Sequence, residues 1–177
     1  MLDKILVAID ESASSEWAFD TALAMAKPLN AELVLVHVLD AFSTNSPKHP
    51  CVLVETFSTD LGDSAQKAYE QEWQQFVDRH SALLRQRQSE AEAAGVATTC
   101  IQTQGVPGLK VCEIARTEDI DLILVGNRDR TNQRELDNGS VSNYLVHHAP
   151  CSVTVVHPKT HSETALPSSD SRVAAVA

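Results

Sequence analysis

The 177-residue chain lacks the sequence features that define several classes of protein. Its four cysteines (Cys51, Cys100, Cys112 and Cys151) include no CxxC pair, which disfavours both a zinc site and a disulfide framework. No apolar run approaches the roughly 20 residues that span a bilayer. No signal peptide is visible, because the apolar run 5–9 is short and acidic residues follow it directly. We therefore expect a cytoplasmic protein without a membrane span.

Basic residues and the common catalytic motifs are also scarce. Lys and Arg number 14 against 24 Asp and Glu, for a net charge of -10, and the sequence contains no run of basic residues. Such a chain repels nucleic acid and anionic membranes, so neither is an expected partner. The nucleophile-elbow pattern GxSxG and the zinc motif HExxH are both missing, and the histidines lack zinc-site spacing. We expect neither a dedicated catalytic site nor a histidine-bound metal.

Short apolar runs alternate with helical patterns along most of the chain. Runs bounded by turn residues predict strands over residues 4–9, 33–39, 96–102, 122–125 and 151–156. Periodic apolar positions predict helices after Asp10 as far as Leu29, and over 64–94, 109–117 and 140–148. This alternation indicates an α/β fold, a parallel sheet with helices on both faces. A long loop is expected over 41–63 and a disordered tail over 159–177.

The most informative segment runs from Leu122 to Val156. An apolar run ends in Gly126, a polar loop follows, and Gly139-Ser140 opens an amphipathic helix before the last strand. The first turn of a helix presents unpaired N–H groups and the positive end of the helix dipole, which together suit a phosphate. Ligands of open parallel sheets bind beyond the carboxyl ends of the strands. If the strands that end near Asp10 and Gly126 are neighbours, both residues border one crevice.

The sequence resembles the universal stress proteins. It opens with ILVAID-x-S at residues 5–12 and closes with GNRDR-x8-GSVSNYLVHHAPCSVTVV at 126–156, and the lengths of the intervening helices also agree. The resemblance covers residues 1–158, apart from part of the 41–63 loop, and leaves the tail 159–177 outside. It implies a single three-layer α/β/α domain of Rossmann-like fold, with a five-stranded parallel sheet in the order 3-2-1-4-5. It also implies a homodimer formed through strand 152–156.

The resemblance further implies ATP binding by a stress-response regulatory protein, with AMP or ADP as alternatives, through the pattern G-x2-G-x9-G-[ST]. The residues implied to contact the phosphates or line their loop are Gly126, Asn127, Arg128, Asp129, Gly139, Ser140, Val141 and Ser142. Those implied to contact adenine and ribose are Ala8, Ile9, Val38 and Asp10. Asp10 would also help to hold Mg²⁺, whose ligands are hard oxygens. A protein partner, as yet unknown, would recognise the loop once the nucleotide has ordered it.

One position departs from the family's pattern, because Asp129 stands where the second glycine is expected. Aspartate tolerates the left-handed backbone region better than most residues, so the loop shape is compatible with it. Its carboxylate, about 4–6 Å from a triphosphate, would repel the phosphates by about 1 kcal/mol or more at an intermediate dielectric. Arg128, Arg130 or a bound cation would offset this repulsion.

Three functions are therefore compatible with the sequence. The first is an ATP-binding regulatory homodimer with at most slow ATP hydrolysis. The second is a nucleotide-free dimeric interaction module, which the carboxylate of Asp129 favours. The third is a nucleotidyl transferase or ATP pyrophosphatase on the same superfamily fold. The HxGH and SGGxDS signatures of those enzymes are replaced here by VAIDESASS at residues 7–15, which ranks the third function last.

Overall fold

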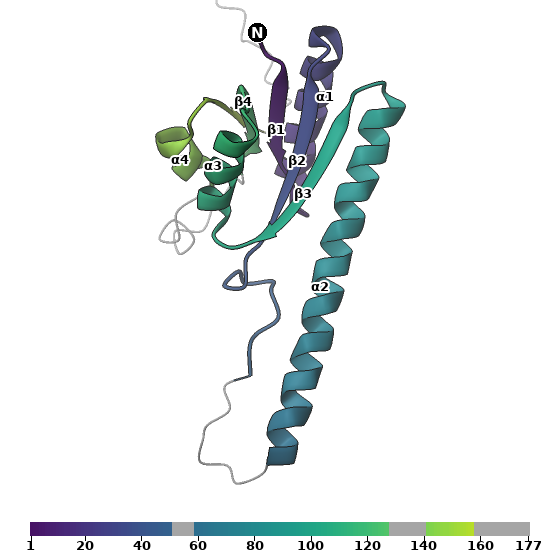
Figure 1. The fold of residues 1–177 in the computed structure, drawn as a ribbon, viewed down its shortest axis with the longest axis vertical. Coiled ribbons are helices and arrows are strands. Elements are labelled where there is room, and N and C mark those ends of the chain that lie inside the picture. Colours follow the sequence, from purple (N-terminus) through teal and green to yellow (C-terminus); the bar gives the residue numbers. More distant parts are fainter. Residues whose placement is uncertain (51–58, 128–140, 158–177) are drawn as a thin grey trace, which may run out of the picture.

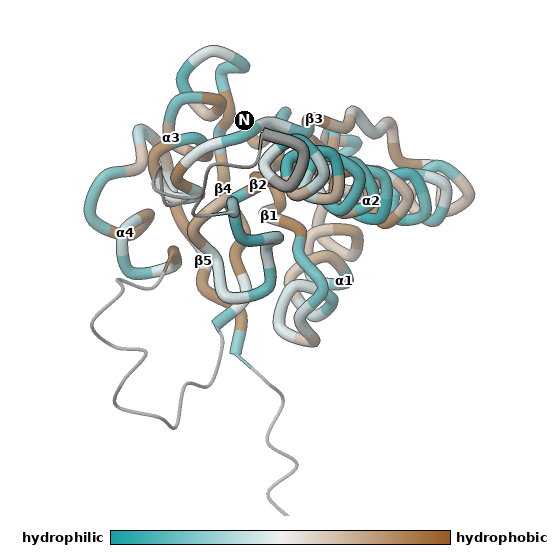
Figure 2. The backbone as a smooth tube through the Cα atoms, turned by 90° about the horizontal axis from the view of Figure 1, so that it is seen from below, coloured by the Kyte–Doolittle hydropathy of each residue, from teal (hydrophilic) through white to brown (hydrophobic). Residues whose placement is uncertain are grey.

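The computed structural model describes residues 1–50, 59–127 and 141–157. Its strands are β1 (Lys4–Ala8), β2 (Glu32–Leu39), β3 (Thr98–Gln104), β4 (Leu122–Gly126) and β5 (Ser152–Val156), and its helices are α1 (Ala13–Leu29), α2 (Thr59–Ala93), α3 (Pro107–Thr117) and α4 (Val141–His148). The neighbouring strands are all parallel and form one sheet in the order β3-β2-β1-β4-β5. Helices α1 and α2 cover one face of this sheet, and α3 and α4 cover the other (Figure 1, Figure 2). The predicted α/β fold and strand order are confirmed.

Each face of the sheet has its own hydrophobic core. Leu33 and Leu35 of β2 pack with α1 and α2, whereas Val34 and Val36 pack with α3 and α4. Successive side chains of a strand point to opposite faces, so a strand that is covered on both sides has to be apolar throughout. This explains why the three central strands are nearly unbroken apolar runs in the sequence.

Helix α2 is much longer than the strands it covers. Its 35 residues span about 52 Å at 1.5 Å per residue, and its first turns extend beyond the edge where the strands end (Figure 1). The helix begins at Thr59 rather than at the expected Ser64, so residues 59–63 of the expected loop are helical. The added residues 59–63 read TDLGD, with one large apolar residue, and so lack the apolar stripe by which a sequence reveals a helix. No helix in the described ranges is long and apolar enough to cross a membrane.

The two edge strands are less apolar than the central strands. β3 begins at Thr98 instead of the expected Val96, because Val96 packs into the core from the turn that ends α2. It also continues through Thr103 and Gln104, polar residues that an edge strand can leave partly exposed. In the described part of the chain β5 pairs only with β4, and its residues are exposed or half-buried. Within those ranges, each side of the sheet therefore ends at a strand with one unpaired edge.

Candidate functional site

The carboxyl ends of β1 and β4 lie side by side in the middle of the sheet. The register pairs Val7 with Leu124, so the two strands end at nearly the same level. From β1 the sheet continues through β2 to β3 on one side, and through β4 to β5 on the other. The direction of winding reverses between β1 and β4, and this is where ligands bind in open parallel sheets. Asp10 follows the end of β1 and Gly126 ends β4, so both residues lie at this switch point.

Asp10 belongs to the N-terminal cap of α1. Its carboxylate accepts hydrogen bonds from the N–H of Ser12, at 2.8 Å, and from the Ser12 hydroxyl. Its own N–H donates to Oγ of Ser15 at 2.9 Å. Ser12 is the N-cap residue, because its Oγ accepts from the N–H of Ser15. These bonds hold Asp10 at the end of β1, with its negative charge beside the positive end of the α1 dipole.

Gly126 contacts the same turn of α1 from β4. A Cβ atom on Gly126 would lie only 2.2 Å from the carbonyl oxygen of Ser14 and 2.8 Å from its Cβ. The hydroxyl of Ser14 lies 2.9 Å from that of Ser12, which in turn donates to Asp10. The close approach of β4 to α1 therefore requires glycine, and a chain of contacts joins Gly126 to Asp10.

The residues expected around adenine lie on two different faces of the sheet. Ala8 and Val38 are partly buried on the face covered by α3 and α4. Ile9 is 4% exposed, and its side chain lies in the core on the opposite face, among residues of α1 and α2. The structure thus places Ala8 and Val38 on one face and separates the Ile9 side chain from both.

The expected phosphate-contacting residues are described only in part. Val141 begins α4 and packs against the core under α3 and α4, and Ser142 is buried. The N–H of Asn127 donates to the carbonyl oxygen of Val156 at 2.8 Å, and its side-chain amide lies 3.1 Å from Nδ1 of His157. The Asn127 side chain is thus engaged at the end of β5. The remaining expected residues lie outside the described residues: Arg128, Asp129, Gly139 and Ser140.

A pair of buried histidines, missed by the sequence analysis, lies behind the segment that carries Asp10. His37 of β2 and His80 of α2 are 6% and 5% exposed, and their rings stack with centroids 4.2 Å apart. Nδ1 of His37 donates to the carbonyl oxygen of Ile9 at 2.7 Å. Burial lowers the pKa of His37, against the opposing effect of this hydrogen bond. The sequence held one signal: His80 follows Phe76 by four residues and so occupies an apolar-stripe position of its helix.

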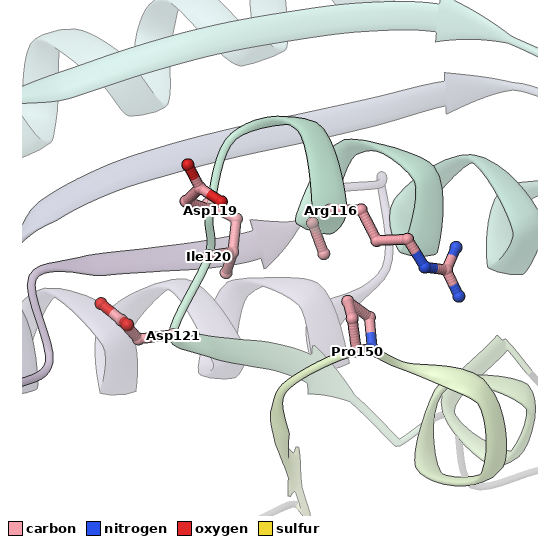
Figure 3. A pocket seen from close by; sticks show the side chains of 6 residues that line it. Arg116, Asp119, Ile120, Asp121 and Pro150 are labelled. Atoms are coloured by element: carbon pink, nitrogen blue, oxygen red, sulfur yellow. The ribbon is translucent and has the colours of Figure 1, made fainter.

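A surface pocket lies at the other end of the strands, where β4 and β5 begin, between the end of α3 and Pro150 (Figure 3). Arg116 and Asp121 are among the residues that line it. Hydrogen bonds from the N–H groups of Lys4, at 3.0 Å, and Asp3, at 2.8 Å, lower the pKa of the Asp121 carboxyl. These bonds tie β1 to β4 and give Asp121 a structural role. No group of three His, Cys, Asp or Glu residues that could hold a metal occurs here or elsewhere in the described ranges.

Sequence comparison decides the family. The family model described as the universal stress protein family matches residues 1–157. The chain belongs to the universal stress protein family. Universal stress protein YxiE of Bacillus subtilis is 30% identical to it over 158 residues, which cover 88% of this chain and 99% of that protein.

Solved structures of other universal stress proteins share the fold of this one. A universal stress protein in complex with cAMP superposes with a TM-score of 0.61 at 22% identity, over 88% of this chain and 97% of that one. A universal stress protein family member from Arabidopsis thaliana, with AMP bound, gives a TM-score of 0.59 at 19% identity, over 89% and 93% of the two chains. At these identities the likeness establishes the Rossmann-like α/β fold alone.

Proposed function

We propose that this universal stress protein binds an adenine nucleotide at the carboxyl ends of β1 and β4, and that it acts as a cytoplasmic stress-response regulator. The observation that carries the proposal is the position of Asp10 and Gly126 at the switch point of the sheet, joined through Ser12 and Ser14. The AMP and cAMP bound to relatives of the same fold support adenine as the base. ATP is the expected nucleotide, with AMP and ADP as alternatives.

The proposal gives each part of the site a distinct role. Ala8 and Val38 would border the adenine ring on the face of α3 and α4, next to the Ile9 backbone, and Asp10 would accept a hydrogen bond from a ribose hydroxyl. The phosphates would lie against the N-terminal end of α4, because the first-turn N–H groups and the dipole of a helix favour anions. The residues proposed for that contact are Gly126, Asn127, Arg128, Gly139, Ser140, Val141 and Ser142.

The donor set suits a magnesium ion that arrives with the nucleotide. Mg²⁺ prefers octahedral oxygen ligands and keeps several waters, so it is usually held by one or two carboxylates together with phosphate oxygens. Asp10 supplies one carboxylate at the switch point, where its hydrogen bonds to Ser12 fix its orientation. We therefore propose that Asp10 and the phosphates share the ion.

The proposed assembly is a homodimer that pairs two copies of β5. Val153 and Val155 are half-buried against the core under α3 and α4, and β5 has an unpaired edge in the described part of the chain. Exposed apolar edges tend to be paired or covered. A second copy of the same strand would supply that partner.

The second candidate function is a dimeric interaction module that binds no nucleotide. The observation in its favour is Asp129, whose carboxylate replaces the second glycine of the family's nucleotide-binding pattern. In that case the acidic surface of the chain would meet a protein partner directly.

Calorimetric titration of nucleotide-stripped protein tests the two candidates. We expect about one MgATP per chain, with AMP, ADP and cAMP compared in parallel. Gly139→Val should weaken binding at least ten-fold, because it adds bulk where the phosphates are proposed to lie. Gly62→Ala is the matched control, since a Cβ on Gly62 in α2 would meet nothing within 4 Å. Flat heats that Asp129→Gly restores would favour the interaction module, and flat heats from both proteins would refute nucleotide binding.

A further inference from the structure

The peptide group between Ile9 and Asp10 is held at both of its polar atoms. Its carbonyl oxygen accepts from Nδ1 of His37 at 2.7 Å, and its N–H donates to Oγ of Ser15 at 2.9 Å. The preceding N–H, of Ile9, donates to the carbonyl oxygen of Val36 at 2.8 Å. Two side chains, an imidazole and a hydroxyl, therefore help to set the orientation of the backbone that carries the Asp10 carboxylate.

We infer that His37 is a positioning residue of the nucleotide site, which holds the Ile9–Asp10 peptide in the orientation that presents Asp10 to the ligand. This inference rests on the proposed function. His37 itself lies on the face of α1 and α2, opposite to Ala8 and Val38, so it acts through the backbone and not by touching the nucleotide.

The protonation state of the His37 ring follows from its partner. A carbonyl oxygen only accepts, so Nδ1 must carry the proton, and Nε2 of the neutral ring is left with a lone pair. This Nε2 is buried and has no hydrogen-bond partner among the described residues. Leaving a buried polar atom unpaired is unfavourable, and a leucine of similar size would avoid that loss. At this position the imidazole donates a hydrogen bond to Ile9, which an aliphatic side chain cannot do.

His80 holds the His37 ring in place from α2. The two rings are nearly parallel, with an interplanar angle of 12°. Nδ1 of His80 donates to the carbonyl oxygen of Phe76 at 2.8 Å, and its Nε2 lies 3.7 Å from the carboxylate of Glu11. The ring of Phe76 packs edge-on against His80. These contacts restrict the imidazole to the orientation in which Nδ1 reaches Ile9.

The expected loss on removing the hydrogen bond is about ten-fold in nucleotide affinity. If the segment without this bond occupies its binding geometry only about one tenth of the time, the apparent affinity falls about ten-fold. Two variants separate the hydrogen bond from the rest of the side chain. His37→Asn keeps an N–H donor near the position of Nδ1, whereas His37→Leu fills a similar volume without a donor.

The experiment measures MgATP affinity by calorimetry and the urea midpoint of unfolding for the wild type, both His37 variants and Leu84→Ala. Leu84 is 3% exposed in the same core, so its truncation tests whether lost stability alone weakens binding. We expect His37→Leu to bind about ten-fold more weakly, and His37→Asn and Leu84→Ala to bind within about two-fold of the wild type. If His37→Leu does not fold, His37→Gln takes its place, because the glutamine amide lies near Nε2 and not near Nδ1.

A double-mutant cycle with Asp10→Asn tests whether His37 acts through Asp10. If it does, His37→Leu should weaken binding by less than three-fold in the Asp10→Asn background. Affinity that His37→Leu leaves unchanged, or that falls equally in His37→Asn and Leu84→Ala, would overturn the inference. Failure of the wild type to bind any adenine nucleotide would instead refute the proposed function and remove the basis of this inference with it.

Discussion

Replacing Gly126 by alanine tests the contact between β4 and the first turn of α1. The new Cβ would lie 2.2 Å from the Ser14 carbonyl oxygen, whereas real Cβ atoms essentially never come closer than 3.0 Å. One of the two backbones therefore has to move by about 1 Å. Forced backbone shifts of this kind in a packed core typically cost about 1–3 kcal/mol. Because the contact is with backbone atoms, no rotamer change of Ser14 relieves it.

Urea denaturation at a fixed protein concentration measures this loss. With a slope of about 2 kcal/mol/M, a loss of about 2 kcal/mol lowers the midpoint by about 1 M. Gly62→Ala makes the same chemical change in α2, where no atom lies within 4 Å of the new Cβ. It should stabilise the protein by about 0.5–1 kcal/mol, because glycine is unfavourable inside a helix. Ser14→Ala should leave the effect of Gly126→Ala intact, since it retains the Ser14 carbonyl.

An unchanged midpoint for Gly126→Ala would refute the close approach. Gly126 would then be left with its proposed phosphate role alone, and the substitution should weaken nucleotide binding without affecting stability. A lower midpoint with normal nucleotide affinity in the folded fraction would mean that Gly126 is needed for packing and not for phosphate binding. The pair of measurements thus separates two explanations that the sequence motif cannot distinguish.

Three other predictions follow from local contacts. Gly108→Ala places a Cβ 2.6 Å from the Tyr144 ring, so urea midpoints should show it destabilising, and a Gly108→Ala/Tyr144→Ala double variant should be more stable than the sum of the single losses indicates. Burial lowers the pKa of His37, and the titratable groups that face it are His80, Asp10 and Glu11. Below pH 6.5 the unfolded chain binds a proton that the folded chain does not, so the free energy of unfolding should decrease as the pH falls from 6.5 to the lowered pKa of His37. In His37→Asn the urea midpoint should change less over this pH range. Val155→Pro removes a ladder donor from β5, so light scattering should show a monomer or aggregate, and an intact dimer would contradict pairing through β5.

The fold could be predicted because its signals are local. The central strands are buried on both faces and so read as apolar runs, and glycine or proline marks several of the turns between them. The errors lie where tertiary context replaced the local signal. Thr59 begins a helix that projects past the sheet, and Val96 supplies its apolar side chain to the core from a turn instead of from β3.

The candidate site could be predicted only in part. A motif identifies the loop residues that would contact a ligand, but it does not identify the residues that hold the loop in place. Asp10 and Gly126 were expected at one crevice, and the structure places both at the switch point of the sheet. His37 was invisible because a histidine inside an apolar run looks like any strand residue. Its partner His80 lies on a different element, and only folding brings the two rings together.

The two faces of the sheet therefore have different roles at the proposed site. Asp129→Asn should separate the effect of charge near the phosphates from the effect of backbone geometry at Asp10. Ala8 and Val38 lie on the face of α3 and α4, whereas the ring that holds the Asp10 backbone lies on the other face. If nucleotide binds as proposed, neutralising Asp129 changes the charge near the phosphates but leaves the hydrogen bond of His37 unchanged. Affinity for MgATP should rise about five-fold at low salt, the equivalent of about 1 kcal/mol of relieved repulsion, and the gain should shrink at high salt because counterions screen the charge. The effect of His37→Leu should be the same at both salt concentrations, since it reflects geometry. A gain from Asp129→Asn that does not depend on salt would mean that residue 129 acts through loop shape, and charge repulsion would no longer be the argument against nucleotide binding.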